Sequence, residues 1–76
     1  PVPGAFFIHK GERYKILKAE IGKGIGKSGE VISDYLEVAC GDKQSIKIKE
    51  IQRQGKKSQN IGEFMLGSQI KKGTII

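Results

Sequence analysis

The clearest alternation of apolar and polar positions lies at residues 45–51, which read SIKIKEI. In an extended chain Ile46 and Ile48 point to one side, and the polar residues around them point to the other: Ser45, Lys47 and Lys49. A period of two residues is typical of a β-strand with one face on a core and the other in solvent. This segment therefore predicts a half-buried strand whose outer face is basic.

Three further segments predict strands. Residues 13–21 (RYKILKAEI) place Tyr14 and Ile16 on one face and three apolar residues on the other, Leu17, Ala19 and Ile21. Residues 30–32 (EVI) begin a second strand after a glycine-rich stretch. Residues 35–40 (YLEVAC) contain three apolar residues, Leu36, Val38 and Cys40, that alternate with Glu37 and Ala39. All three are short and rich in β-formers, as strands of a small sheet usually are.

Residues 60–67 (NIGEFMLG) predict one short helix. Asn60 is suited to cap its start, Glu63 stands at the capping-box position and Gly67 can end it. The spacing of three apolar residues places them on one helix face that can dock onto a sheet: Ile61, Phe64 and Met65. Beyond the helix, residues 69–76 can add a last strand.

The chain has 76 residues, enough for a single domain spanning residues 1–76 with a small core. Short strands, glycine-rich connections and one short helix predict a mainly all-β fold, a small antiparallel OB-like barrel. Four aromatic residues are expected in its core: Phe6, Phe7, Tyr14 and Phe64. Because the sequence begins at Pro1 rather than at methionine, we expect it to be a piece of a longer protein.

The glycine-rich stretch at residues 22–29 matches two nucleotide-binding patterns at least in part. Residues 24–29 (GIGKSG) satisfy G-x-G-x-x-G, and residues 26–28 (GKS) end like a P-loop, although Ile21 occupies the position of its first glycine. Both motifs need a helix directly after the loop to hold the phosphate at its N-terminus. The β-branched, turn-interrupted residues that follow have no helical period, so we interpret the stretch as a flexible connection between strands.

Charge is the strongest global signal: fourteen Lys and Arg against eight Asp and Glu give a net charge of +6. This excess favours a polyanionic partner such as nucleic acid. The alternative is that lysines only keep a β surface soluble and discourage edge pairing.

Other chemistry has little support in the sequence. The single cysteine, Cys40, allows no internal disulfide, which agrees with a reducing compartment, and is expected to be a small buried hydrophobe. Cys40 and the single histidine, His9, lie far apart in sequence, so neither a zinc site nor a Cys-His dyad is indicated. No apolar run approaches the ~20 residues needed to span a bilayer, so no membrane partner is expected.

The candidate RNA contacts are basic residues on predicted strands and loops. The first group comprises the outer strand face, the polar loop that follows it and the glycine-rich stretch: Lys47, Lys49, Lys56, Lys57, Lys23 and Lys27. The second group is Arg13, Lys15 and Lys18. In the glycine-rich stretch, exposed backbone amides could grip phosphates together with the lysines, or the lysines could simply be solvated. Tyr35, beside its turn, is the expected stacking residue.

A series of short motifs resembles the C-terminal domain of the methionyl-tRNA formyltransferase family. The motifs occur in order along nearly the whole chain: PVPGAFF at 1–7, YKILKAE at 14–20, GKSGEV at 26–31, VACGD at 38–42, IKEIQRQGKK at 48–57 and FMLG at 64–67. Ser28 departs from a proline often found there, and Ser58-Gln59-Asn60 replace a segment that contains Pro and Met.

The resemblance implies an OB-like barrel joined in cis to an N-terminal, Rossmann-like catalytic domain. The whole enzyme would transfer a formyl group from 10-formyltetrahydrofolate to methionyl initiator tRNA, and the basic barrel would help to hold the tRNA. The family's catalytic Asn, His and Asp belong to the other domain, so no catalytic residue, metal or cofactor is expected here. We also expect the protein to be a monomer in a bacterial cytoplasm, with an organelle matrix as the alternative location.

Two other functions stay open. The barrel could belong to a formyltransferase that acts on a nucleotide sugar or on folate, with no RNA role. It could also be a free-standing RNA-binding barrel.

Overall fold

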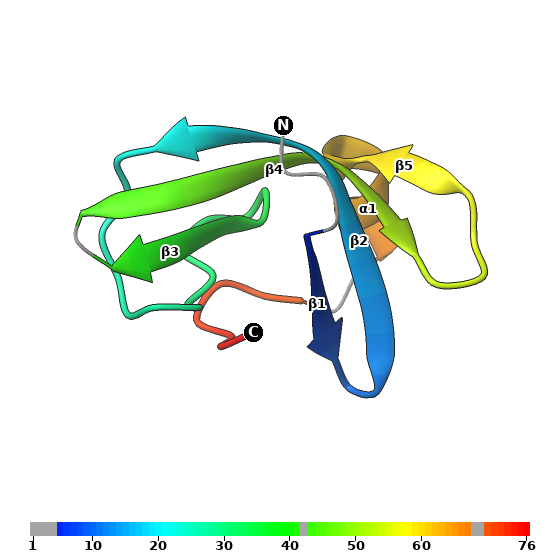
Figure 1. Ribbon diagram of the computed structural model, residues 1–76, viewed down its shortest axis with the longest axis horizontal. Coiled ribbons are helices and arrows are strands. Elements are labelled where there is room, and N and C mark those ends of the chain that lie inside the picture. The colour runs from blue at the N-terminus through cyan, green and yellow to red at the C-terminus, as the bar shows by residue number, and fades with distance from the viewer. Residues whose placement is uncertain (1–4, 42, 68–69) are drawn as a thin grey trace.

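The computed structural model describes residues 5–41, 43–67 and 70–76, which form one curled antiparallel sheet and one short helix (Figure 1). Its strands are β1 (Phe6–His9), β2 (Glu12–Gly22), β3 (Glu37–Gly41), β4 (Gln44–Arg53) and β5 (Ser58–Asn60), followed by α1 (Ile61–Gly67). The strand order is β1-β2-β4-β3, with β5 also paired to β4. The predicted class, a mainly β, barrel-like sheet with one short helix, is confirmed, and the sheet curls as a half-barrel.

The long antiparallel pair β2–β4 forms the centre of the sheet. Its register corrects one sequence-based prediction. Ile16 lies opposite Ile51, and Ala19 lies opposite Ile48. Two residues separate these rungs on each strand, and the register shifts on both sides of Lys18 interrupt the regular alternation, so Ala19 lies on the same side as Ile16. The predicted placement of Ala19 on the face opposite Ile16 is therefore wrong.

Neither the strand predicted at residues 30–32 nor the one predicted in the tail forms a regular strand. Isolated bridges stand in their place: Glu30 pairs with Ile75 in the tail, and Val31 pairs with Val38 on β3. The Val31 N–H donates to the Thr74 carbonyl at 2.8 Å. The Ile76 N–H donates to the Gly29 carbonyl, also at 2.8 Å. This segment thus lies between β3 and the tail and extends the curled sheet by single rungs.

The core fills the concave side of the sheet. It is formed by Tyr14, Val31, Leu36, Ile48, Ile51, Phe64 and Ile70. The Tyr14 ring is stacked on Phe7 at 5.0 Å between centroids and meets the edge of Phe64 at 5.6 Å. Helix α1 is therefore held to the sheet through Phe64, as its apolar spacing predicted. Its cap is confirmed as well, because the Glu63 N–H donates to Asn60 Oδ1 at 2.9 Å.

Two residues expected inside lie at the surface. Phe6 is 48% exposed, because it alternates with Phe7 along β1 and Phe7 takes the core side. Cys40 is exposed as well. It follows Val38 on the same side of β3, but the core ends at Val38.

The glycine-rich stretch packs onto the sheet, and no helix follows it. The Gly24 N–H donates to Ser45 Oγ at 3.0 Å, and Ser45 in turn donates to Glu37 Oε2 at 2.5 Å. Ser45, expected on the solvent face, is consequently buried. A Cβ on Gly24 would clash with Ile32 Cδ1 and lie 2.6 Å from Glu37 Oε2, so any larger residue there would force these two side-chain ends to move. No helix begins in the described residues that directly follow the stretch, as predicted, but the stretch is a packed covering of the sheet rather than a bare connection.

Two elements were not foreseen. Strand β1 precedes the first predicted strand, and β5 occupies the end of the segment interpreted as a polar loop, residues 53–59. None of the helices in the described part of the chain is long and apolar enough to span a membrane.

Candidate nucleic-acid interface

Lys47 and Lys49 are exposed on the outer face of β4, as predicted, but carboxylates flank them. Lys47 lies in register with Glu20 on β2 and with Glu37 on β3. Lys49 Nζ lies 3.5 Å from Glu20 Oε1. Directly opposed charges on one sheet face offset each other, so this face carries much less positive field than the alternation of its lysines suggests.

These two lysines do come together with the expected stacking residue. Tyr35, which is 67% exposed, lines a groove of about 410 Å³ together with Lys47, Lys49 and Glu37. The groove therefore contains both predicted kinds of RNA contact and also a carboxylate, which disfavours phosphate.

In the glycine-rich stretch the lysine side chains are exposed but several amides are already in use. The N–H groups of Gly24, Lys27 and Gly29 donate to Ser45 Oγ, Glu30 Oε1 and the Ala39 carbonyl, respectively. Phosphate binding by these amides would have to break those bonds. The exposed side chains of Lys23 and Lys27 therefore stay the predicted contacts at this stretch, while these three amides are occupied.

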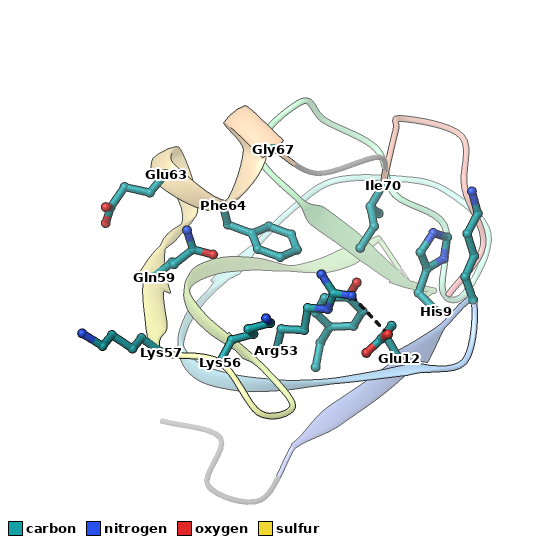
Figure 2. A pocket seen from close by; sticks show the side chains of 12 residues that line it. His9, Glu12, Arg53, Lys56, Lys57, Gln59, Glu63, Phe64, Gly67 and Ile70 are labelled. Atoms are coloured by element: carbon teal, nitrogen blue, oxygen red, sulfur yellow. Dashed lines mark hydrogen bonds and ion pairs between the residues drawn. The ribbon is translucent and has the colours of Figure 1, made fainter.

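A groove of about 660 Å³ lies between the β1–β2 turn, the end of β4, β5 and α1; we call it the hairpin groove (Figure 2). Apolar core residues contribute to its lining, Tyr14, Phe64 and Ile70. Its charged lining includes four cations: Lys10, Arg53, Lys56 and Lys57. Two carboxylates, those of Glu12 and Glu63, also line it.

The β1–β2 turn brings an unforeseen cation to this groove. Lys10 and Gly11 have φ angles of 52° and 80°, which is the left-handed pair of a two-residue hairpin turn. The sequence signal was a lysine–glycine pair between two β-rich runs, FFIH and ERYKI. It was missed because β1 itself was not recognised.

An ion pair joins the two sides of the hairpin groove. Arg53 Nη2 donates to Glu12 Oε1 at 3.1 Å, drawn as the dashed line in Figure 2. This hydrogen bond, together with the guanidinium charge, lowers the pKa of the Glu12 carboxyl below its ordinary value of 4.5. The same contact raises the pKa of Arg53. The pair fixes the guanidinium at the start of the β4–β5 loop.

A second groove of about 370 Å³, the outer groove, meets the hairpin groove at Arg53, which lines both. Its other lining residues are Arg13, Lys15, Gln52, Gln54 and Gly55, so no carboxylate is among them. We define the cationic end as the six basic residues of the two grooves: Lys10, Arg13, Lys15, Arg53, Lys56 and Lys57. Four of the nine predicted RNA contacts meet here, namely Arg13, Lys15, Lys56 and Lys57.

The remaining predicted contacts lie elsewhere. Lys18 pairs in register with Glu50, and Lys23 and Lys27 belong to the glycine-rich covering. Lys47 and Lys49 form the separate, carboxylate-flanked group on β4.

In the described part of the chain, no group of three or more His, Cys, Asp or Glu residues lies close enough together to hold a metal ion. His9 lines the hairpin groove, and its buried Nε2 has no hydrogen-bond partner among the described residues.

Comparison with known proteins agrees with the motif series. Residues 1–69 match the family model described as formyl transferase, C-terminal domain. A methionyl-tRNA formyltransferase of Pelagibacter ubique is 68% identical over 76 residues, which are all of this chain and 24% of that protein. Methionyl-tRNA formyltransferases of Rickettsia felis and Paramagnetospirillum magneticum are 44% and 40% identical and are covered to 25% each, again over all of this chain. The chain thus spans about a quarter of the length of these relatives, and it belongs to the formyl transferase C-terminal domain family.

Proposed function

We propose that this chain is the tRNA-binding C-terminal domain of a methionyl-tRNA formyltransferase. In this proposal a catalytic domain in cis transfers the formyl group from 10-formyltetrahydrofolate to methionyl initiator tRNA in translation initiation. The barrel is a single domain over residues 1–76, supplies no catalytic residue and works as a monomeric unit in a bacterial cytoplasm. The names of the relatives support the activity, and the cationic end supports the role of this part.

The observation that carries the proposal is that two cation-lined grooves share Arg53. Six basic side chains line the two grooves; Arg53 and Glu12 offset each other as an ion pair, which leaves five other cations and the carboxylate of Glu63. Basic side chains at such a surface displace counterions from phosphates, which gives an affinity that falls with salt. Contacts of this kind hold and orient the RNA without reading its bases.

The test is a titration of the chain with an initiator tRNA transcript over a series of salt concentrations. Two double variants lose the same charge at different places, Lys56→Gln/Lys57→Gln at the cationic end and Lys47→Gln/Lys49→Gln on the outer face of β4. The first should reduce the slope of log K against log salt by about 2, since each lost phosphate contact removes about one unit. The second should change the slope by less, because carboxylates already offset those lysines.

Three other outcomes would each contradict part of the proposal. Absent or salt-insensitive binding would remove the RNA role and favour a barrel from an enzyme that acts on a nucleotide sugar or on folate. Tight, sequence-selective binding by the chain alone would favour a free-standing RNA-binding barrel. A larger loss in the β4 double variant would move the interface to the outer strand face.

A further inference from the structure

Phe6 sits where an aromatic ring contributes little to the core. It lies on the outer face of β1, while its neighbour Phe7 stacks on Tyr14 inside. The guanidinium carbon of Arg13 lies 4.0 Å above the centre of the Phe6 ring. An exposed cation–π pair stabilises a fold only weakly, so stability alone gives weak reason for a half-exposed phenylalanine here.

The stack stands at the edge of the outer groove. Arg13 belongs both to the stack and to the groove lining, and Lys15, the register partner of Phe6, lines the groove as well. Two amide side chains, Gln52 and Gln54, line it further along. The site thus combines a flat cationic plane, a second cation on the same sheet face and amide groups beyond them.

We propose that the Phe6–Arg13 stack and the outer groove form a subsite for an unpaired nucleotide of RNA. The base stacks on the open face of the Arg13 guanidinium, which the Phe6 ring holds flat, and an adjacent phosphate is bound by Lys15. Guanidinium planes and aromatic rings are the surfaces on which unpaired bases stack, whereas paired bases in a duplex offer no such face. The inference rests on the proposed function and deepens it, because it adds a preference for single-stranded RNA to a general phosphate attraction.

Charge favours RNA over a protein partner as the occupant. Two cations, Arg13 and Lys15, lie at the stack, and no carboxylate is among the described residues that line the groove. Arg53 also borders the groove, where it is paired with Glu12. An apolar protein surface would leave these charges desolvated, while a phosphate next to the base would pair with them.

The experiment compares two RNA probes with the same number of phosphates, a single-stranded oligonucleotide that contains 2-aminopurine and a blunt duplex. In the unmodified chain, stacking should quench the 2-aminopurine fluorescence of the single strand. Phe6→Leu and Arg13→Lys should each weaken single-strand binding by about fivefold or more and reduce the quenching, since the loss of one base stack has at least about that effect. Phe6→Leu should leave duplex binding and its salt slope unchanged, because Phe6 is not one of the basic residues that bind phosphate. Arg13→Lys keeps the charge, so it should weaken duplex binding much less than single-strand binding.

Leu66→Ala is the control for loss of exposed apolar surface, since Leu66 is 91% exposed on α1. A thermal melt of each variant checks the fold. Equal losses on both probes, or no loss in either variant, would contradict the proposed subsite. The proposed function would still stand in that case if the unmodified chain binds tRNA. If the unmodified chain binds neither probe nor tRNA, the proposed function fails and the subsite fails with it.

Discussion

Gly29 and Gly11 have nearly the same left-handed backbone in very different surroundings. Their φ angles are 86° and 80°. A Cβ on Gly29 would lie 2.7 Å from the Ile76 carbonyl oxygen, whereas a Cβ on Gly11 would meet nothing within 4 Å. The two positions therefore separate the cost of backbone strain from the cost of a steric clash.

We expect Gly11→Ala to destabilise the fold by about 1 kcal/mol, from the left-handed conformation alone. Gly29→Ala should cost about 2–4 kcal/mol, because the tail must also move away from the added methyl group. Urea denaturation of both variants measures the difference. Equal losses would mean that the tail does not press on Gly29 in solution.

At the scale of elements, the short helix α1 depends on its apolar face, where Phe64 is buried in the core and Ile61 and Met65 pack against it. Seven residues are too few for a helix to be stable by itself, and only Phe64 of α1 is buried. The Asn60 cap and the apolar spacing are local signals, so the sequence alone predicted this helix well.

Phe64→Ala should therefore reduce the free energy of unfolding by about 3 kcal/mol or more. The milder Phe64→Leu, which keeps apolar volume but loses the edge contact with Tyr14, should cost about 1 kcal/mol. Leu66→Ala, on the same helix, should stay within about 0.5 kcal/mol. Helical circular dichroism and urea midpoints give the readout, and similar losses at positions 64 and 66 would contradict the docking through Phe64.

The Glu12–Arg53 pair connects the β1–β2 hairpin to the end of β4 and makes stability depend on pH. Because Arg53 lowers the folded-state pKa of Glu12, the pair stabilises the fold above the ordinary pKa of 4.5, and this contribution is lost as pH falls through the lowered value. The melting temperature of the unmodified chain should exceed that of Glu12→Gln near about pH 6, and the difference should vanish well below pH 4.5. A double-mutant cycle with Arg53→Gln isolates the pair. A difference that persists in strong acid would assign the effect to something other than this carboxylate.

Strands were harder to foresee than the helix, because their sides and partners depend on distant residues. The alternation in residues 45–51 correctly predicted that Lys47 and Lys49 are exposed. It could not reveal that Glu20 and Glu37 lie beside them on neighbouring strands. Likewise, no local pattern marks the register shifts at Lys18, which come from pairing with β4. The burial of Ser45 depends on the glycine-rich covering, another long-range contact.

At the scale of the whole molecule, the positive charge is uneven rather than diffuse. The composition predicted a net excess of basic over acidic residues. In the fold, the six basic residues of the cationic end share their two grooves with only two carboxylates among the described lining residues. The candidate site was thus half predictable: Arg13, Lys15, Lys56 and Lys57 were identified as separate residues, while their meeting place and the contribution of Lys10 required the structure.

Removing a carboxylate tests this distribution by a gain of affinity. Glu63→Gln in the hairpin groove should strengthen tRNA binding about twofold to fivefold at low salt, since a charge repelling phosphate is lost within a Debye length of the bound RNA. Glu20→Gln changes the net charge equally but lies on the outer face of β2 and β4, and it should have a smaller effect. Binding is measured by fluorescence anisotropy. Equal gains would show that total charge alone controls affinity.

The rungs between residues 29–31 and the tail have a kinetic consequence. They join a segment in the middle of the described chain, after β2, to residues 74–76, with β3, β4, β5 and α1 between them. Closing so long a loop has an entropic cost, and long-range closures of this kind form slowly. During synthesis these rungs can therefore form only after residues 74–76 have left the ribosome, so this part of the curled sheet closes after all five strands and the helix have been translated.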